Sequence, residues 1–320
     1  MPACRGRRRR GAAAGTRRGA APRAARFADL GGILLATLGA ALCAAQLVGC
    51  ASSLRVGASA DPLAILDPGA LAYVRLTGEA ARAFVPHLLP PSRAASLEPL
   101  LARTRSLAAG VGPADSFGAA LVGDYAFGKA SLMLGNGGDW KRNGNTYVDR
   151  LTGLRVAIPG PDLVVTGSGD LEPLVARAKT PGPSPLPPRL EALSGKQVLI
   201  IAPHPFDGLA SAMLGEPLEV PVLSFVIAAD AEESARQGEA TYLATVAFAM
   251  RDAEAARIYR PILRLAWYAI ARGLFAEGAE RGLAADFTLD GDLFVAHGVE
   301  LTASAMANAM ARLSEDSSFR

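Results

Sequence analysis

Residues 80–86 read AARAFVP, and residues 255–261 read AARIYRP. Each copy follows an apolar stretch typical of a buried strand, residues 70–76 in the first case and 242–250 in the second. Similar segments in matching order, far apart in one chain, indicate an internal repeat. We therefore expect two related halves, with chance similarity between alanine-rich segments as the alternative.

The two expected halves also end in a similar way. Residues 162–165 (DLVV) precede an expected helix at 171–178, and residues 292–295 (DLFV) precede one at 303–313. The shared order is strand, helix pair, antiparallel strands and helix. This order predicts an α+β fold of two related lobes, with helices packed on one face of the sheets.

A proline-rich segment separates the halves. Residues 180–189 read TPGPSPLPPR, a composition that favours stiff, extended backbone and cannot continue a helix or a central strand. The expected organisation is therefore a first repeat at 61–179, a linker at 180–189 and a second repeat at 190–320.

Apolar or alternating runs bounded by Gly, Asn and Pro predict the individual strands. They lie at residues 116–127, 130–134, 146–149, 154–158, 198–202 and 222–228. The leucine-rich stretch at 92–107 predicts the second helix of the first pair.

The first 49 residues have the pattern of an export signal. A basic segment with nine arginines precedes an apolar stretch at about 30–48, which ends in Leu47-Val48-Gly49-Cys50. This ending resembles the lipobox of bacterial lipoproteins. The resemblance implies cleavage before Cys50, acylation of its thiol and new amine, and a lipidated tether at 50–60. A transmembrane anchor with a chance cysteine is the alternative.

Removing this signal peptide changes the composition. The leader contains nine Arg and one Asp, so 24 of 33 basic and 29 of 30 acidic residues remain, a formal net charge of −5. A nucleic-acid partner is therefore not expected. All three cysteines lie at or before residue 50, so no thiol is left for a disulfide, a metal site or a nucleophile. We expect no cofactor. By analogy with enteric sorting, Ala51 in place of Asp directs the protein to the outer membrane.

Residues 198–208 read VLIIAPHPFDG. His204 to Gly208 resembles the His-Pro-Asp-Asp-Glu motif of zinc-dependent GlcNAc deacetylases, which implies His204 and Asp207 as zinc ligands. Here Phe206 replaces the general base of that family and Gly208 replaces its Glu. The other two histidines stand alone, and a working site needs a further ligand. The alternative is a strand and turn with a chance histidine.

Residues 253–277 predict a long amphipathic helix. Its apolar arc contains Ile258, Ile262, Leu263, Ala266, Trp267, Ile270 and Leu274. Its opposite side gathers Arg257, Arg260, Arg264 and Arg272. Basic amphipathic helices with Trp suit a membrane surface, so Trp267, Ile270, Leu274 and the first three arginines are the candidate membrane- or ligand-facing residues. The alternative is a helix laid on the sheet with solvated arginines.

This organisation resembles the treponemal outer-membrane lipoproteins that embed amphipathic helices in the inner leaflet. We therefore expect a non-catalytic envelope lipoprotein, anchored through Cys50 at the periplasmic face of the outer membrane, that binds lipid, an apolar ligand or the membrane surface. A scaffold for an envelope protein complex is the second hypothesis. A metal-dependent hydrolase using His204 and Asp207 is the third.

Overall fold

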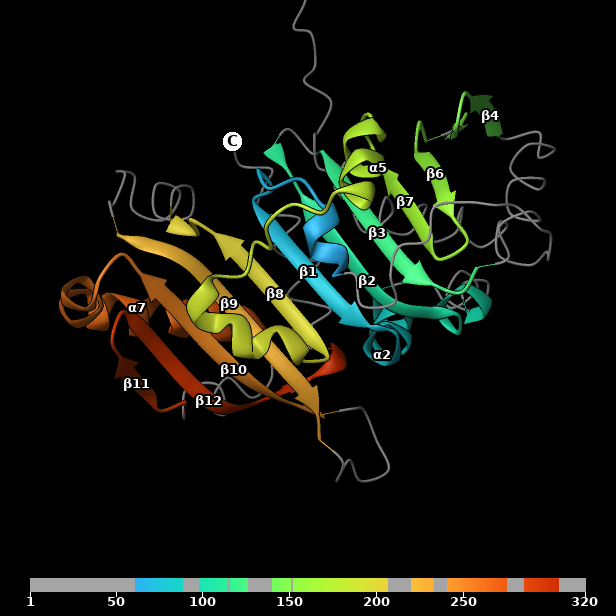
Figure 1. Ribbon diagram of the computed structural model, residues 1–320. Helices are drawn as coiled ribbons and strands as arrows, with labels where there is room; N and C mark the ends of the chain where they lie inside the picture. Colours follow the sequence, from blue (N-terminus) through green and yellow to red (C-terminus); the bar gives the residue numbers. More distant parts are fainter. Residues whose placement is uncertain are drawn as a thin grey trace, which may run out of the picture.

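The computed structural model describes residues 61–88, 98–113, 116–125, 140–150, 152–206, 220–232, 241–274 and 285–304. Its strands within these ranges form one antiparallel sheet in the order β11-β12-β10-β9-β8-β1-β2-β3-β7-β6-β5-β4 (Figure 1). The strands are β1 (Ala72–Thr77), β2 (Thr104–Val111), β3 (Phe117–Gly123), β4 (Trp140–Asn143), β5 (Thr146–Asp149), β6 (Arg155–Gly160), β7 (Leu163–Gly167), β8 (Val198–Pro203), β9 (Val222–Ala231), β10 (Thr241–Met250), β11 (Phe287–Asp290) and β12 (Leu293–Thr302).

Two strands that are distant in the sequence join the two halves of the sheet. β1 pairs with β2 on one side and with β8 on the other, and the β1–β8 register runs from Tyr73 opposite Ile201 to Leu76 opposite Val198. The first half of the chain therefore continues into the second through backbone hydrogen bonds. The expected mixture of strands and helices is present, but the sheet dominates and is continuous.

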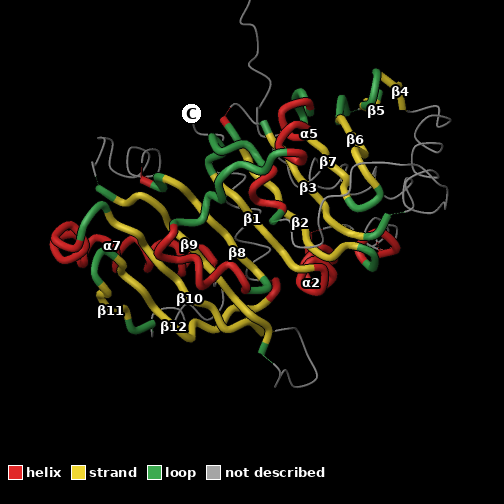
Figure 2. The backbone as a smooth tube through the Cα atoms, in the orientation of Figure 1, coloured by secondary structure: helices red, strands yellow, loops and turns green. Residues whose placement is uncertain are grey.

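Helices cover both faces of this sheet. The helices are α2 (Gly78–Leu88), α5 (Glu172–Lys179) and α7 (Ala253–Leu274), with 3₁₀ helices η2 (Pro62–Ile65) and η4 (Pro188–Gly195). α2 and α7 contribute to one apolar cluster, whereas α5, η2 and η4 contribute to the other. Figure 2 shows η4 in front of the strands and α7 behind them. The prediction of helices on one face was wrong, because both faces of the central strands are apolar and both need cover.

Successive residues of the central strands are buried on alternate faces of the sheet, because the sheet is covered on both sides. In β8, Val198 and Ile200 join the cluster that includes α7, whereas Leu199 and Ile201 join the cluster that includes η4. The proline-rich segment before η4 also packs on the second cluster, through Leu186. It is therefore a covering element of the sheet as well as a connection.

Most predicted strands are confirmed within one to four residues. The exception in the described part is residues 104–107, which were expected to be helical and instead begin β2. β2 pairs with β1 and β3 together, and this pairing outweighs a helical pattern of leucines. The expected strand at 130–134 and most of the helix at 303–313 lie outside the described residues.

The two halves differ in the strands that follow their corresponding helices, α2 and α7. α2 leads into β2, which pairs with β1, whereas the first described strand after α7 is β11, which flanks β12 at the sheet edge. The partner of β10 is instead β12. The duplication of two lobes therefore stays a prediction.

A cluster of aromatic rings stabilises the second half. Phe248 of β10 lies 4.8 Å from Phe225, 6.4 Å from Phe287 and 6.3 Å from Phe294, measured between ring centroids. We expect Phe248→Ala to lower the free energy of unfolding by about 3–5 kcal/mol, because it removes a fully buried ring and leaves a cavity. Chemical denaturation measures the change.

The exposed Ile258 of α7 provides the matched control. Ile258→Ala should change the free energy of unfolding by less than about 0.5 kcal/mol, as surface substitutions usually do. Equal losses in the two variants would contradict the assignment of Phe248 to the core and of Ile258 to the surface.

Candidate functional site

The helix α7 begins at a side-chain cap. The Asp252 carboxylate accepts a hydrogen bond from the Ala255 N–H at 2.7 Å, and the Asp252 carbonyl accepts from the Ala256 N–H at 3.1 Å. This is the arrangement of an N-cap residue. The backbone hydrogen bond lowers the pKa of Asp252, and the adjacent Arg251 lowers it further.

One side of α7 packs on the sheet. Leu263, Trp267 and Ala271 are buried there, and the Trp267 ring meets the Phe287 ring edge-on at 5.8 Å between centroids. Trp267, expected to face a membrane or a ligand, is 3% exposed and belongs to the core. Ile270 is half-buried against the same cluster. The side chain of Leu274 lies outside the described residues.

The opposite side of α7 exposes a second set of apolar side chains. Ile258 is 59% exposed, Ile262 36%, Leu265 67% and Tyr268 43%. At about 100° per residue, Ile258, Ile262 and Leu265 lie within about 60° of one another. They point away from Leu263 and Trp267. We call the four residues Ile258, Ile262, Leu265 and Tyr268 the outer row.

Arginines border the outer row. Arg257, Arg260, Arg264 and Arg272 are all exposed. The only opposing charge on the described helix is Glu254, whose carboxylate lies 4.0 Å from Arg257. Exposed arginines are expected both for a helix on a membrane surface and for a helix with a solvated face, so their role as membrane- or ligand-facing residues stays a prediction. The apolar arc expected from the sequence included Ile258 and Ile262, which are exposed, together with Leu263 and Trp267, which are buried.

A cleft lies where the start of α7 meets the ends of β8 and β9. Its volume is about 420 Å³, and its lining residues are His204, Val220, Pro221, Val222, Leu223, Arg251 and Tyr259. Arg251 donates its backbone N–H to the Pro221 carbonyl, and His204 donates its own to the Leu223 carbonyl, both at 3.0 Å. Leu223 is 46% exposed. Sequence reasoning found His204 but not Arg251 or Tyr259, because the fold alone brings these residues together.

The His204 motif is only partly described. His204 follows β8, and Phe206 packs against the core cluster that includes α7. Asp207 and Gly208 lie outside the described residues. In the part of the chain that the structure describes, no group of three or more His, Cys, Asp or Glu residues could hold a metal ion.

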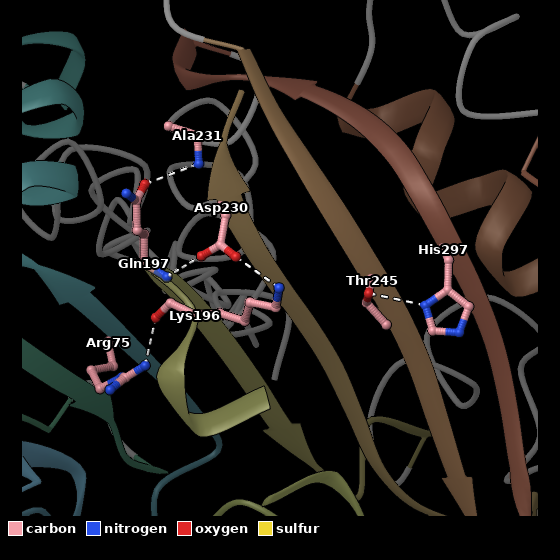
Figure 3. A network of polar contacts seen from close by, with 7 residues as sticks. All are labelled: Arg75, Lys196, Gln197, Asp230, Ala231, Thr245 and His297. Carbon is pink, nitrogen blue, oxygen red and sulfur yellow. Dashed lines mark hydrogen bonds and ion pairs between the residues drawn. The ribbon is translucent and has the colours of Figure 1, made fainter. Parts of the chain in front are cut away.

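The polar contacts of Figure 3 tie strands together. Asp230 of β9 accepts from the Lys196 ammonium at 2.7 Å and the Gln197 N–H at 2.9 Å, and these contacts lower its pKa against the opposing effect of burial. Arg75 donates to the Lys196 carbonyl at 2.6 Å, and burial lowers the pKa of this arginine. These contacts support the β1–β8–β9 junction.

On the sheet face opposite α7, the His297 ring nitrogen Nδ1 lies 3.1 Å from the Thr245 hydroxyl. Leu243 is 43% exposed on the same face, since its neighbours Tyr242 and Ala244 both point into the α7 cluster. His297 does not lie in the cleft with His204. The sequence histidines are therefore not gathered in one described site.

None of the helices in the described ranges has the length and apolar character needed to cross a bilayer. Cys50 and the leader lie outside these ranges.

Of the comparisons with known proteins, the comparison with solved structures gives matches. No family model matches the chain, and no curated protein matches it. Crystal forms I, III and IV of the treponemal protein TP0453 have similar structures, with TM-scores of 0.57, 0.55 and 0.54. Their sequence identities are 19%, 17% and 18%.

The match extends over most of both proteins. It covers 80%, 80% and 79% of this chain and 99%, 99% and 98% of the chain of TP0453. At this identity the likeness shows a shared fold.

Asp252→Ala should lower the melting temperature by removing the cap that starts α7. Because folding lowers the pKa of Asp252, its stabilisation is present above the ordinary carboxyl pKa and is lost as the pH falls through the folded value. The difference between the two proteins should therefore shrink below about pH 4. Thermal melts from pH 3 to pH 7 measure it, with the exposed Asp286→Ala as control. A difference that grows in acid would contradict the capping role.

Proposed function

We propose that this protein is a non-catalytic envelope lipoprotein that rests the outer row of α7 on a lipid surface. Its anchor is the acylated Cys50, at the periplasmic face of the outer membrane. The outer row is the observation that carries the proposal, because a folded helix has already buried Leu263 and Trp267 and still exposes four large apolar residues. Contiguous exposed apolar surface marks contact with a membrane or a partner.

The energetics favour a surface contact that depends on the anchor. Full burial of one large apolar side chain is worth about 1.5–3 kcal/mol, and the residues of the outer row are already partly covered. Their combined contribution supports weak, reversible association. An acylated cysteine keeps the helix close to the bilayer, which makes such a weak contact effectively intramolecular.

The flanking arginines suit the headgroups of anionic lipids. A cationic side chain near an anionic leaflet contributes about 1 kcal/mol. Arg257, Arg264 and Arg272 border the outer row, although the chain after residue 49 has a formal net charge of −5. The local excess of positive charge on α7 therefore opposes the overall charge of the domain and favours one orientation toward an anionic surface.

The shared fold with TP0453 is compatible with an envelope protein of this kind. A scaffold of an envelope complex is the alternative, because a protein groove also accepts an apolar helix face with arginines at its border. The two hypotheses differ in whether pure lipid binds.

The outer row can be tested with vesicles. The chain from residue 52 onward should sediment with vesicles that contain phosphatidylglycerol, and a double variant with Ile258→Glu and Leu265→Glu should bind at least about tenfold more weakly. Leu243→Glu is the matched control, since Leu243 is 43% exposed on the opposite face of the sheet. Circular dichroism checks that each variant is folded.

Two results would contradict membrane contact through α7. Absence of vesicle binding by the unaltered chain would favour the scaffold. An equal loss with Leu243→Glu would show that α7 is not the contact face.

The anchor has its own test. Intact mass measurement of the protein from membranes should give a chain that begins at Cys50 and carries acyl groups. Cys50→Ala should leave the leader uncleaved and the acyl mass absent, because the resemblance to a lipobox makes the Cys50 thiol the attachment site. Acylation or cleavage that persists in this variant would remove Cys50 from the proposal.

A further inference from the structure

The cleft between β8, β9 and α7 combines polar and apolar lining residues. Three side chains able to donate hydrogen bonds, those of His204, Arg251 and Tyr259, line it together with apolar residues from the start of β9. Among the residues of the cleft that the structure describes, none is an Asp or Glu. Such a lining favours an anion that carries an apolar group.

The backbone at His204 is strained. Its φ of 46° is in the left-handed region, although it is followed by Pro205, and a residue before proline is ordinarily extended. The His204 N–H nevertheless bonds to the Leu223 carbonyl of β9. This bond fixes the turn at the end of β8 and holds His204 among the lining residues of the cleft.

A hydrogen bond holds the backbone of Arg251 in place, whereas its guanidinium group is exposed. Its backbone N–H bonds to the Pro221 carbonyl, and its side chain is 70% exposed. Asp252 accepts from its Nε at 3.1 Å, while the Asp252 carboxylate also caps α7. Within the described ranges, the Nε contact with Asp252 is the ion pair of Arg251, and the two terminal nitrogens of its guanidinium fork can face an external anion. A planar fork suits two oxygens of a phosphate.

We infer that this cleft binds a phosphate ester, with Arg251 as the principal donor and His204 and Tyr259 as further donors. Leu223, which is 46% exposed, offers apolar surface to the ester group, whereas the neighbouring lining residues Val220 and Val222 are buried in the core. The phosphate belongs to a lipid headgroup or to a soluble metabolite, and both present the same chemistry to the cleft.

The position of Tyr259 connects the cleft with the outer row. On α7, Tyr259 is about 60° from Ile262 and about 100° from Ile258. A headgroup held at Tyr259 would therefore have its acyl chains near the outer row. This lipid case rests on the proposed function, whereas binding of a soluble phosphate does not.

Histidine NMR on the full chain in a non-ionic detergent tests the inference. The chain has three histidines, so a protein labelled with ¹³C in the histidine rings gives three ring signals that single His→Asn variants assign. Titration with glycerol 3-phosphate should shift the His204 signal saturably and leave the His297 signal in place. Arg251→Gln should weaken this binding about tenfold, because it removes a charge-assisted contact.

Arg105→Gln is the matched control, because Arg105 is an exposed arginine on β2, outside α7, and does not line the cleft. It should change the affinity less than about twofold. Saturation by glycerol 3-phosphate and by inorganic phosphate identifies a soluble source. A shift only with micelles that contain phosphatidylglycerol, and not with phosphatidylcholine, identifies an anionic lipid headgroup.

Two outcomes would overturn the inference: a His204 signal that none of these probes moves, or equal losses in Arg251→Gln and Arg105→Gln. If Arg251→Gln loses the His204 response but still binds vesicles, the outer row binds the membrane without the cleft. Conversely, an outer-row variant that loses vesicle binding but keeps its response to glycerol 3-phosphate would show that the cleft binds without the outer row.

Discussion

The antiparallel pairing of β1 with β8 is the contact on which the rest of the structure depends. It joins the two halves through the register from Tyr73–Ile201 to Leu76–Val198. Because successive residues point to opposite faces, Leu76 and Val198 extend one apolar cluster across the junction while Tyr73 and Ile201 extend the other. Both clusters are thereby continuous over the middle of the sheet, and both faces need helical cover.

In the second half of the chain, α7 covers one face of the sheet. Only one side of this helix contacts the sheet. Leu263 and Trp267 fill the contact with the sheet, whereas the outer row makes no contribution to the core. A helix that is apolar on two sides needs a second apolar environment for the exposed side. In the proposal, a lipid surface provides it for the outer row, and the cleft at Tyr259 places a phosphate beside it.

The sequence predicts the parts of this structure that local patterns determine. Strands such as β8 and β9 are recognisable because a proline bounds each apolar run, at the end of β8 and before β9, and α7 is recognisable because its amphipathic pattern is long. The β1–β8 pairing is not recognisable, since the two strands are far apart in the chain. Residues 104–107 were misassigned for the same reason, because their pairing with β1 and β3 is non-local. A helical projection puts Ile258 and Trp267 on opposite sides of α7, but it cannot tell which of the two sides the sheet buries.

The most direct test of the account is the environment of the outer row on a membrane. The chain from residue 52 onward contains no cysteine, so a single spin label can be placed at position 265 or, as a reference, at position 243. With vesicles containing phosphatidylglycerol, the label at 265 should become more accessible to oxygen and less accessible to a polar nickel chelate, and the label at 243 should not change. Unchanged accessibility at 265 while the protein is bound to vesicles would contradict the account.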